Sequence, residues 1–149
     1  MIERSFDYDL INGILRDPII FATIAEDCNV DRETYKTAES EDIYYLVGYV
    51  KGEPIGVFIV HPDSACSYQL HVNMLKQYRA KYSRIASEKA LEWISENIGR
   101  TKINVAIPDI YRNVIKCAED CGFIFEGLKT RSYLKDGIIR DVILMGRCL

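Results

Sequence analysis

The chain has 149 residues, of which 48% are hydrophobic and 28% charged, with a formal net charge of -3 and an isoelectric point near 5.4. This length and composition are typical of one folded domain with a full hydrophobic core and argue against disorder, so we expect residues 1–149 to form a single domain. The acidic balance disfavours a general nucleic-acid-binding protein, although it is compatible with a local basic patch.

Several features predict a soluble, cytoplasmic protein without a membrane partner. Residues 1–13 mix acidic with apolar side chains and form a poor signal peptide, and the longest apolar run, residues 18–25, is too short to cross a bilayer. The five cysteines form no CxxC pair, which suits reduced thiols better than disulfides: Cys28, Cys66, Cys117, Cys121 and Cys148.

The first third of the chain predicts two helices, a polar loop and a hairpin. Ser5 suits the N-cap of a helix over residues 5–17, and Pro18 suits the first turn of a second helix. Residues 28–42 are polar and predict a loop. Two runs rich in β-branched and aromatic residues then flank the turn sequence KGEP, which indicates strands at 43–50 and 55–62.

The rest of the chain alternates strands with helices. Residues 66–75 predict a strand, followed by a long helix that ends at Gly99 and carries an apolar stripe of Tyr82, Ile85, Ala86, Ala90, Trp93, Ile94 and Ile98. Further along, the pattern predicts a strand at 102–108, a short helix at 111–121 closed by Gly122, and a hairpin with an Asp136-Gly137 turn. Helices interleaved with strands and hairpins indicate an α/β protein with a mixed sheet.

Three segments resemble, in order, parts of the GNAT (GCN5-related N-acetyltransferase) superfamily. Residues 52–62 resemble its central hairpin, residues 72–94 the strand–loop–helix that holds acetyl-CoA, and residues 105–146 its final strand–helix–strand region. The resemblance implies a GNAT-like domain with a central twisted sheet, two N-terminal helices, a long central helix and a short late helix. Residues 17–28 and 67–75 are also similar to a subfamily of tailed bacteriophages and prophages, which implies the host cytoplasm or the virion as the location.

The resemblance implies acetyl-CoA as the cofactor. In the family, backbone amides of a loop of the form Gln/Arg-x-x-Gly-x-Gly/Ala face the pyrophosphate, backbone groups of a strand hold the pantetheine arm, and an asparagine often begins the late helix. The matching loop residues here are Arg79, Ala80, Lys81, Tyr82, Ser83 and Arg84, so two large side chains replace the small ones. The matching strand residues are Asn73, Met74 and Leu75, and Tyr111 stands at the asparagine position.

Charge at this junction supports an anion site. Lys76, Arg79, Lys81 and Arg84 surround the predicted helix start, and the first acid is Glu88. Cations there oppose the helix dipole by about 0.3–1 kcal/mol each, and a bound anion would relieve that opposition. The alternative is a solvated basic loop in which Tyr82 is a core residue.

Two side chains on one predicted strand are candidate catalytic groups. Alternation places Gln69 and His71 on the same side, where His71 is a workable base near its ordinary pKa and Gln69 orients a substrate. The alternative is a structural His71. His61 is predicted to be a turn residue. Ala118 stands where the family often has a tyrosine acid, and its neighbour Cys117 forms with Cys121 too small a set for a metal site, so we expect none.

Two hypotheses about function follow. The first is an N-acyltransferase that moves an acetyl or related acyl group from coenzyme A to an amine, and whose activity the sequence leaves open. The second is a non-catalytic GNAT-fold module that binds a protein partner, as in phage assembly or DNA delivery. The C-terminal hairpin predicts an edge strand, which favours pairing in a homodimer.

Overall fold

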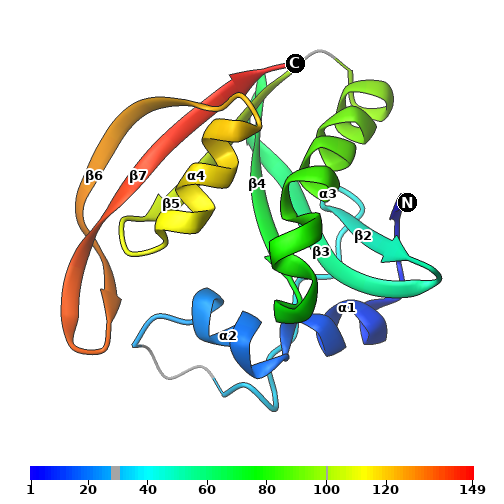
Figure 1. The fold of residues 1–149 in the computed structure, drawn as a ribbon, viewed down its shortest axis with the longest axis horizontal. Helices are drawn as coiled ribbons and strands as arrows, with labels where there is room; N and C mark the ends of the chain where they lie inside the picture. Colours follow the sequence, from blue (N-terminus) through cyan, green and yellow to red (C-terminus); the bar gives the residue numbers. More distant parts are fainter. Residues whose placement is uncertain (28–30, 100) are drawn as a thin grey trace.

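A seven-stranded sheet in the order β1-β2-β3-β4-β5-β7-β6 organises the computed structural model, which describes residues 1–27, 31–99 and 101–149 (Figure 1). The strands are β1 (Ile2–Arg4), β2 (Tyr44–Val50), β3 (Glu53–Ser64), β4 (Ser67–Met74), β5 (Lys102–Pro108), β6 (Ile124–Lys135) and β7 (Ile138–Cys148). The predicted mixed α/β sheet is confirmed. β1 was not predicted, because three residues are too few for alternation to be visible.

The centre of the sheet contains a parallel pair that separates along its length. β4 and β5 pair only from Ser67–Gln69 to Lys102–Asn104, whereas the other neighbouring strands are antiparallel. β4 continues along β3 to Met74, and β5 continues along β7 to Pro108. Beyond the three paired residues the two strands diverge (Figure 1), so the facing edges of β4 and β5 have no strand partner within the described part of the chain.

Two short helices pack on one face of the sheet. In α1 (Tyr8–Leu15) the N-cap is Asp7, whose side chain accepts a hydrogen bond from the Leu10 amide at 3.0 Å, so the predicted Ser5 cap is wrong. The Ser5 hydroxyl instead accepts from the Asp7 amide. In α2 (Pro18–Ile24) Pro18 occupies the first turn as predicted. Both helices share a core cluster with β2 and β3.

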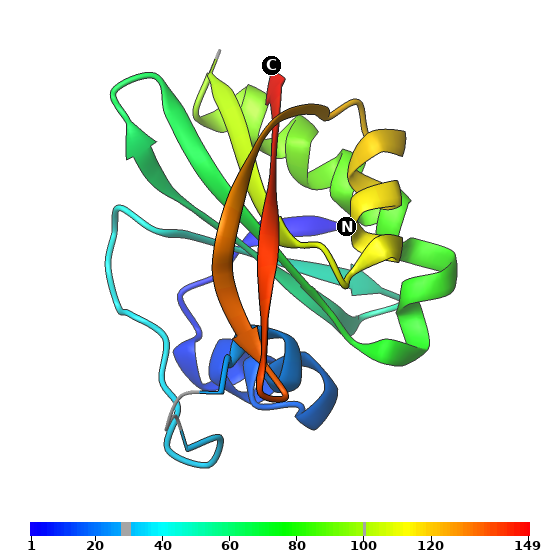
Figure 2. The same ribbon diagram turned by 90° about the vertical axis from the view of Figure 1, so that its left-hand side faces the viewer.

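The long and the late helix cover the opposite face (Figure 2). α3 (Lys76–Asn97) buries Ala86, Ala90 and Ile94, and α4 (Arg112–Asp120) lies beside it. Ile85 is 54% exposed, contrary to the predicted stripe, because it is one residue, or about 100°, away from the buried row. No helix among the described residues is long and apolar enough to cross a membrane.

The turns follow the predicted glycine positions. Lys51-Gly52 and Asp136-Gly137 both have positive φ, as tight two-residue hairpin turns require. Gly99 and Gly122 follow α3 and α4 with φ of 96° and 82°. The predicted polar loop contains neither helix nor strand from residue 31 to 42, whereas Cys28 and the rest of its start lie outside the described residues.

Gly56 on β3 allows β4 to approach closely just where β4 leaves β5. A Cβ atom at Gly56 would lie 2.5 Å from the Asn73 carbonyl oxygen and 2.9 Å from the Met74 Cα. Because both are backbone atoms, we expect Gly56→Ala to lower the free energy of unfolding by about 1–3 kcal/mol in a denaturant titration.

Gly13 in α1 provides a matched control for that prediction. A Cβ atom there would meet nothing within 4 Å, and alanine favours a helix, so Gly13→Ala should leave stability unchanged or slightly raised. A Gly56→Ala protein as stable as the Gly13→Ala protein would contradict the prediction.

Candidate active site

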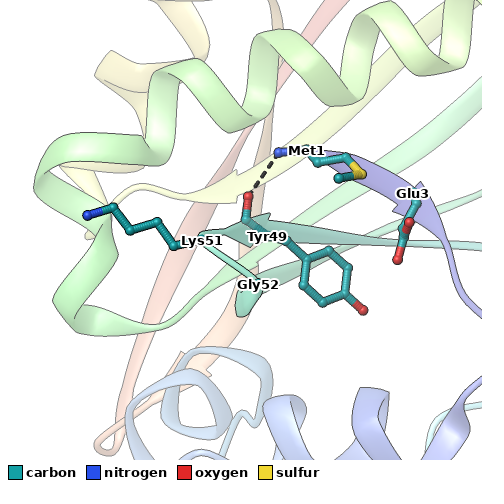
Figure 3. A pocket seen from close by; sticks show the side chains of 5 residues that line it. All are labelled: Met1, Glu3, Tyr49, Lys51 and Gly52. Atoms are coloured by element: carbon teal, nitrogen blue, oxygen red, sulfur yellow. Dashed lines mark hydrogen bonds between the residues drawn. The ribbon is translucent and has the colours of Figure 1, made fainter.

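A cleft of about 1380 Å³ lies where β4 and β5 diverge. Its walls include α3 and α4 on one face of the sheet and residues of β2, β3, β4 and β6 on the other, so it passes through the sheet. A second pocket of about 460 Å³ lies at the β1–β2 edge (Figure 3). That notch is lined by Met1, Glu3, Tyr49, Lys51 and Gly52 and holds neither histidine, so the large cleft is the candidate site.

The α3–α4 side of this cleft is strongly cationic. Its wall includes Lys76, Arg79, Lys81, Arg84, Arg112 and Lys116, and Asp120 is the one carboxylate among the described residues of the whole lining. Such a concentration of positive side chains, in a chain of net charge -3, produces a local field that attracts anions. The cleft therefore favours a ligand with several negative charges at this mouth.

The predicted loop at this junction is instead helical. α3 begins at Lys76, directly after β4, and includes Arg79, Ala80, Lys81, Tyr82, Ser83 and Arg84. The segment has no glycine, and alanine, lysine and arginine favour helix formation, so the helix extends back to the end of the strand. Amides inside a helix donate to the carbonyl four residues earlier, so those of residues 80–84 are no longer available to a phosphate.

Arg79 and Arg84 differ in how far a neighbouring side chain compensates their positive charge. The Arg79 Nε atom donates to the Met74 carbonyl oxygen at 2.8 Å, which anchors the side chain on a neutral acceptor and leaves its other N–H donors for a ligand. The Arg84 Nε atom donates to Glu88 Oε1 at 3.0 Å, and this bond raises the pKa of Arg84. Arg79 therefore presents the less compensated charge.

The opposite side of the cleft contains both histidines. In the register of β3 and β4, His71 lies across from Ile59 and His61 across from Gln69, which places all four on the face that carries α1 and α2. The two Nε2 atoms lie 3.1 Å apart, and the ring planes differ by 17°. The prediction of His61 as a turn residue is thus wrong, since it belongs to β3 and lines the cleft.

The surroundings of His71 disfavour its charged form. Its ring is solvent-accessible but lies within the concave cleft, where neighbouring protein atoms replace part of the hydration shell of an imidazolium. Burial is the main cause that holds the pKa of His71 below its ordinary value, and His61 lowers it further. His71 is consequently a neutral imidazole at pH 7.

A tyrosine pair reaches the cleft from two distant segments. Tyr111, just before α4, and Tyr133 on β6 lie with their hydroxyl oxygens 2.9 Å apart. Burial, followed by this hydrogen bond, raises the pKa of Tyr133, so the Tyr133 hydroxyl carries its proton at neutral pH. Sequence reasoning missed Tyr133 because an irregular stretch between Lys129 and Tyr133, with Arg131 at φ 52°, interrupts the alternation of β6.

Most residues predicted for the site line the cleft: His71, Asn73, Met74, Arg79, Ala80, Lys81, Ser83, Arg84 and Tyr111. Three do not. Gln69 lies where β4 still pairs with β5, outside the gap. Leu75 packs beside the α1–α2 core and Tyr82 beside the α3–α4 core.

Cys117 also lines the cleft, next to Cys121 on the α3–α4 side. Hydrogen bonds from the side chains of Cys121 and Ser87 lower the pKa of Cys117 to about 7. Within the described part of the chain, no three His, Cys, Asp or Glu side chains come together in a way that could hold a metal ion.

Comparison with known proteins identifies the fold. No family model and no curated protein matches the chain. Among solved structures, a spermidine N-acetyltransferase from Vibrio cholerae, in complex with CoA and spermine, superposes with a TM-score of 0.82 at 15% identity, over 99% of this chain and 94% of that one. The chain has the GNAT fold.

Other structures with the GNAT fold agree over the full length. A ribosomal-protein-alanine N-acetyltransferase from Brucella melitensis matches with a TM-score of 0.79 at 18% identity, covering 100% of this chain and 99% of that one. A GNAT-family acetyltransferase from Streptococcus pneumoniae matches with a TM-score of 0.75 at 19% identity, with the same coverage. The structural neighbours are thus N-acetyltransferases, and the predicted GNAT-like architecture is confirmed.

Proposed function

We propose that this protein is an N-acyltransferase that transfers an acetyl or related acyl group from coenzyme A to an amine. One observation carries the proposal. A single cleft runs from a cationic α3–α4 side, through the gap between β4 and β5, to a side that holds His71. An acyl donor and an amine entering from opposite faces of the sheet would meet in that gap.

The residues of the α3–α4 side suit coenzyme A through side chains rather than backbone amides. Its phosphates would be held by charge-assisted bonds from Arg79, Lys81 and Arg84, with Ala80 and Ser83 in the same wall. From Leu70 to Met74 the edge of β4 that faces β5 pairs with no strand among the residues that the structure describes. Backbone groups at Asn73 and Met74 are therefore candidates to hold the pantetheine arm. Coenzyme A would supply the acyl group as an activated thioester.

The protein's own groups account for the proton movements of acyl transfer. His71 accepts the proton that the amine nitrogen loses as the new carbon–nitrogen bond forms. The sulfur that leaves must be protonated, and the Tyr133 hydroxyl, which is hydrogen-bonded to Tyr111, is the protonated donor that lines the cleft. Holding both reactants in the correct orientation within one gap lowers the activation free energy further.

The charged residues that line the cleft also indicate which class of amine would act as the acyl acceptor. The histidine side of the cleft contains Lys129, and none of its described residues is a carboxylate. A polyamine such as the spermine bound to the Vibrio enzyme would meet repulsion there without a compensating acid. We therefore propose an acceptor with a single amine and no further positive charge.

Calorimetric titration with acetyl-CoA and with free coenzyme A, at low and moderate salt, tests the proposal. We expect saturable binding that weakens as salt rises, because the cationic wall contributes through screened charges. An amine screen that includes spermine should then show turnover with monoamines and none with the polyamine. Absence of saturable binding up to millimolar ligand would overturn the proposal.

The outer edge of the sheet is a candidate surface for protein–protein interaction. β6 is an edge strand, and Ile124, Phe125 and Leu128 on it are 67%, 63% and 51% exposed. Such an edge suits pairing with a second copy, in a non-catalytic phage or host protein as well as in an enzyme. Sedimentation analysis of the wild type and of Phe125→Lys distinguishes a β6-mediated dimer, which the variant disrupts, from a monomer.

A further inference from the structure

The hydrogen bonds of the two histidines determine where their protons lie. His61 Nδ1 is 3.2 Å from the Pro62 carbonyl oxygen, and a carbonyl only accepts, so Nδ1 carries the hydrogen. A neutral imidazole has one N–H, which leaves His61 Nε2 as an acceptor. The Nε2 of His71, 3.1 Å away, must therefore donate to it. The one unprotonated nitrogen left in the pair is Nδ1 of His71.

We propose that His61 is a positioning residue that holds His71 in its Nε2–H form and so presents His71 Nδ1 as the base. This inference rests on the proposed function, because it assigns a role within that reaction. Among the described residues, no protein group is hydrogen-bonded to His71 Nδ1, so this nitrogen is free to meet a substrate. The opposite arrangement would place a hydrogen on Nδ1 and leave His71 without a lone pair for the amine.

The pair also stabilises the product of proton transfer. When Nδ1 of His71 receives the amine proton, the ring becomes an imidazolium, and its Nε2–H bond to His61 becomes charge-assisted. A proton on His61 Nε2 would occupy the lone pair that accepts this bond, so the bond requires that nitrogen to stay unprotonated. Besides His71, the titratable groups that line this side are His61, Tyr35, Tyr45, Lys129 and Tyr133. Of these, His61 is the group that lowers the pKa of His71.

Nitrogen-15 NMR of the imidazoles tests the proton positions without any need for activity. The chain contains only two histidines, so His61→Phe and His71→Phe assign each ring directly. We expect His61 as the Nδ1–H tautomer, which is distinctive, and His71 as the Nε2–H tautomer. Observation of His61 protonated at Nε2, or of both rings charged at pH 7, would overturn the inference.

Kinetics of two variants tests the positioning role. His61→Gln retains an oxygen that accepts from His71 Nε2–H, whereas His61→Phe retains the ring shape without an acceptor. We expect His61→Phe to lower kcat about ten- to a hundredfold with little change in the KM for the amine, and His61→Gln to restore most of the rate. Equal kcat in both variants and the wild type would contradict the role of His61. A wild type without turnover would remove the proposed function and with it this role, while NMR would still decide the proton positions.

Discussion

Replacing His71 with alanine is expected to lower kcat by about 10²- to 10⁴-fold, the usual contribution of a positioned general base. In the proposed reaction His71 is the base, because its pKa is held below its ordinary value and its side chain lines the cleft. The measurement is steady-state turnover with acetyl-CoA and a monoamine. Thermal unfolding of the variant establishes that the sheet is intact, and a rate that survives the substitution would remove this assignment.

The pH profile gives an independent check on the same residue. Because its pKa lies below the ordinary value of about 6.5, His71 stays neutral as the pH falls toward that value and gains a proton only below it. With an aromatic amine as acceptor, which is itself uncharged in this range, we expect kcat/KM to be level from pH 8 to about 6.5 and to decline at lower pH. An acid limb with its midpoint above about pH 7 would indicate a different base.

Reversing the charge of Arg79 is expected to weaken coenzyme A binding by about ten- to a hundredfold at low salt, because a charge-assisted bond to phosphate is lost and repulsion replaces it. Arg79 is held at the cleft by the Met74 carbonyl and forms no ion pair with a carboxylate of the described residues. Arg84 already shares its charge with Glu88, so Arg84→Glu should have a smaller effect than Arg79→Glu. Calorimetric titration measures both.

Two control variants separate charge at the cleft from other effects. Lys89→Glu reverses a charge on the same helix at a residue that does not line the cleft and should leave binding unchanged. Arg79→Lys keeps the charge and loses the anchor to Met74, so it should retain part of the affinity. Identical titration curves for Arg79→Glu and the wild type would contradict an anion site at α3.

Much of the fold could be predicted from local patterns. The hairpin turns at Lys51-Gly52 and Asp136-Gly137 need positive φ, which the sequence signals directly. Pro18 marks the start of α2, and alternation places β2, β3 and β5 within a few residues. These features depend on neighbours in the chain, so they are legible without tertiary information.

At the start of α3, the prediction from the family resemblance was wrong. Alignment placed a loop at residues 79–84, whereas the helix begins at Lys76. The family's loop contains glycines, which permit a non-helical backbone. The residues at 79–84 of this chain contain no glycine and are ordinary helix formers. Local propensity therefore outweighed the family resemblance at this point. In the proposed function, side chains rather than backbone amides would hold the phosphates.

By itself, the sequence determined the mixed sheet, the order of the elements after β1, the cations at the α3 junction and the candidacy of His71, because each depends on residue type and short spacing. Only the tertiary structure decided that β4 and β5 separate after three paired residues, that His61 meets His71 across two strands, and that an irregularity in β6 carries Tyr133 to Tyr111. These contacts depend on strand register and on the path of a bulged strand. Packing of the whole sheet sets both, and neither leaves a periodic signal in the chain.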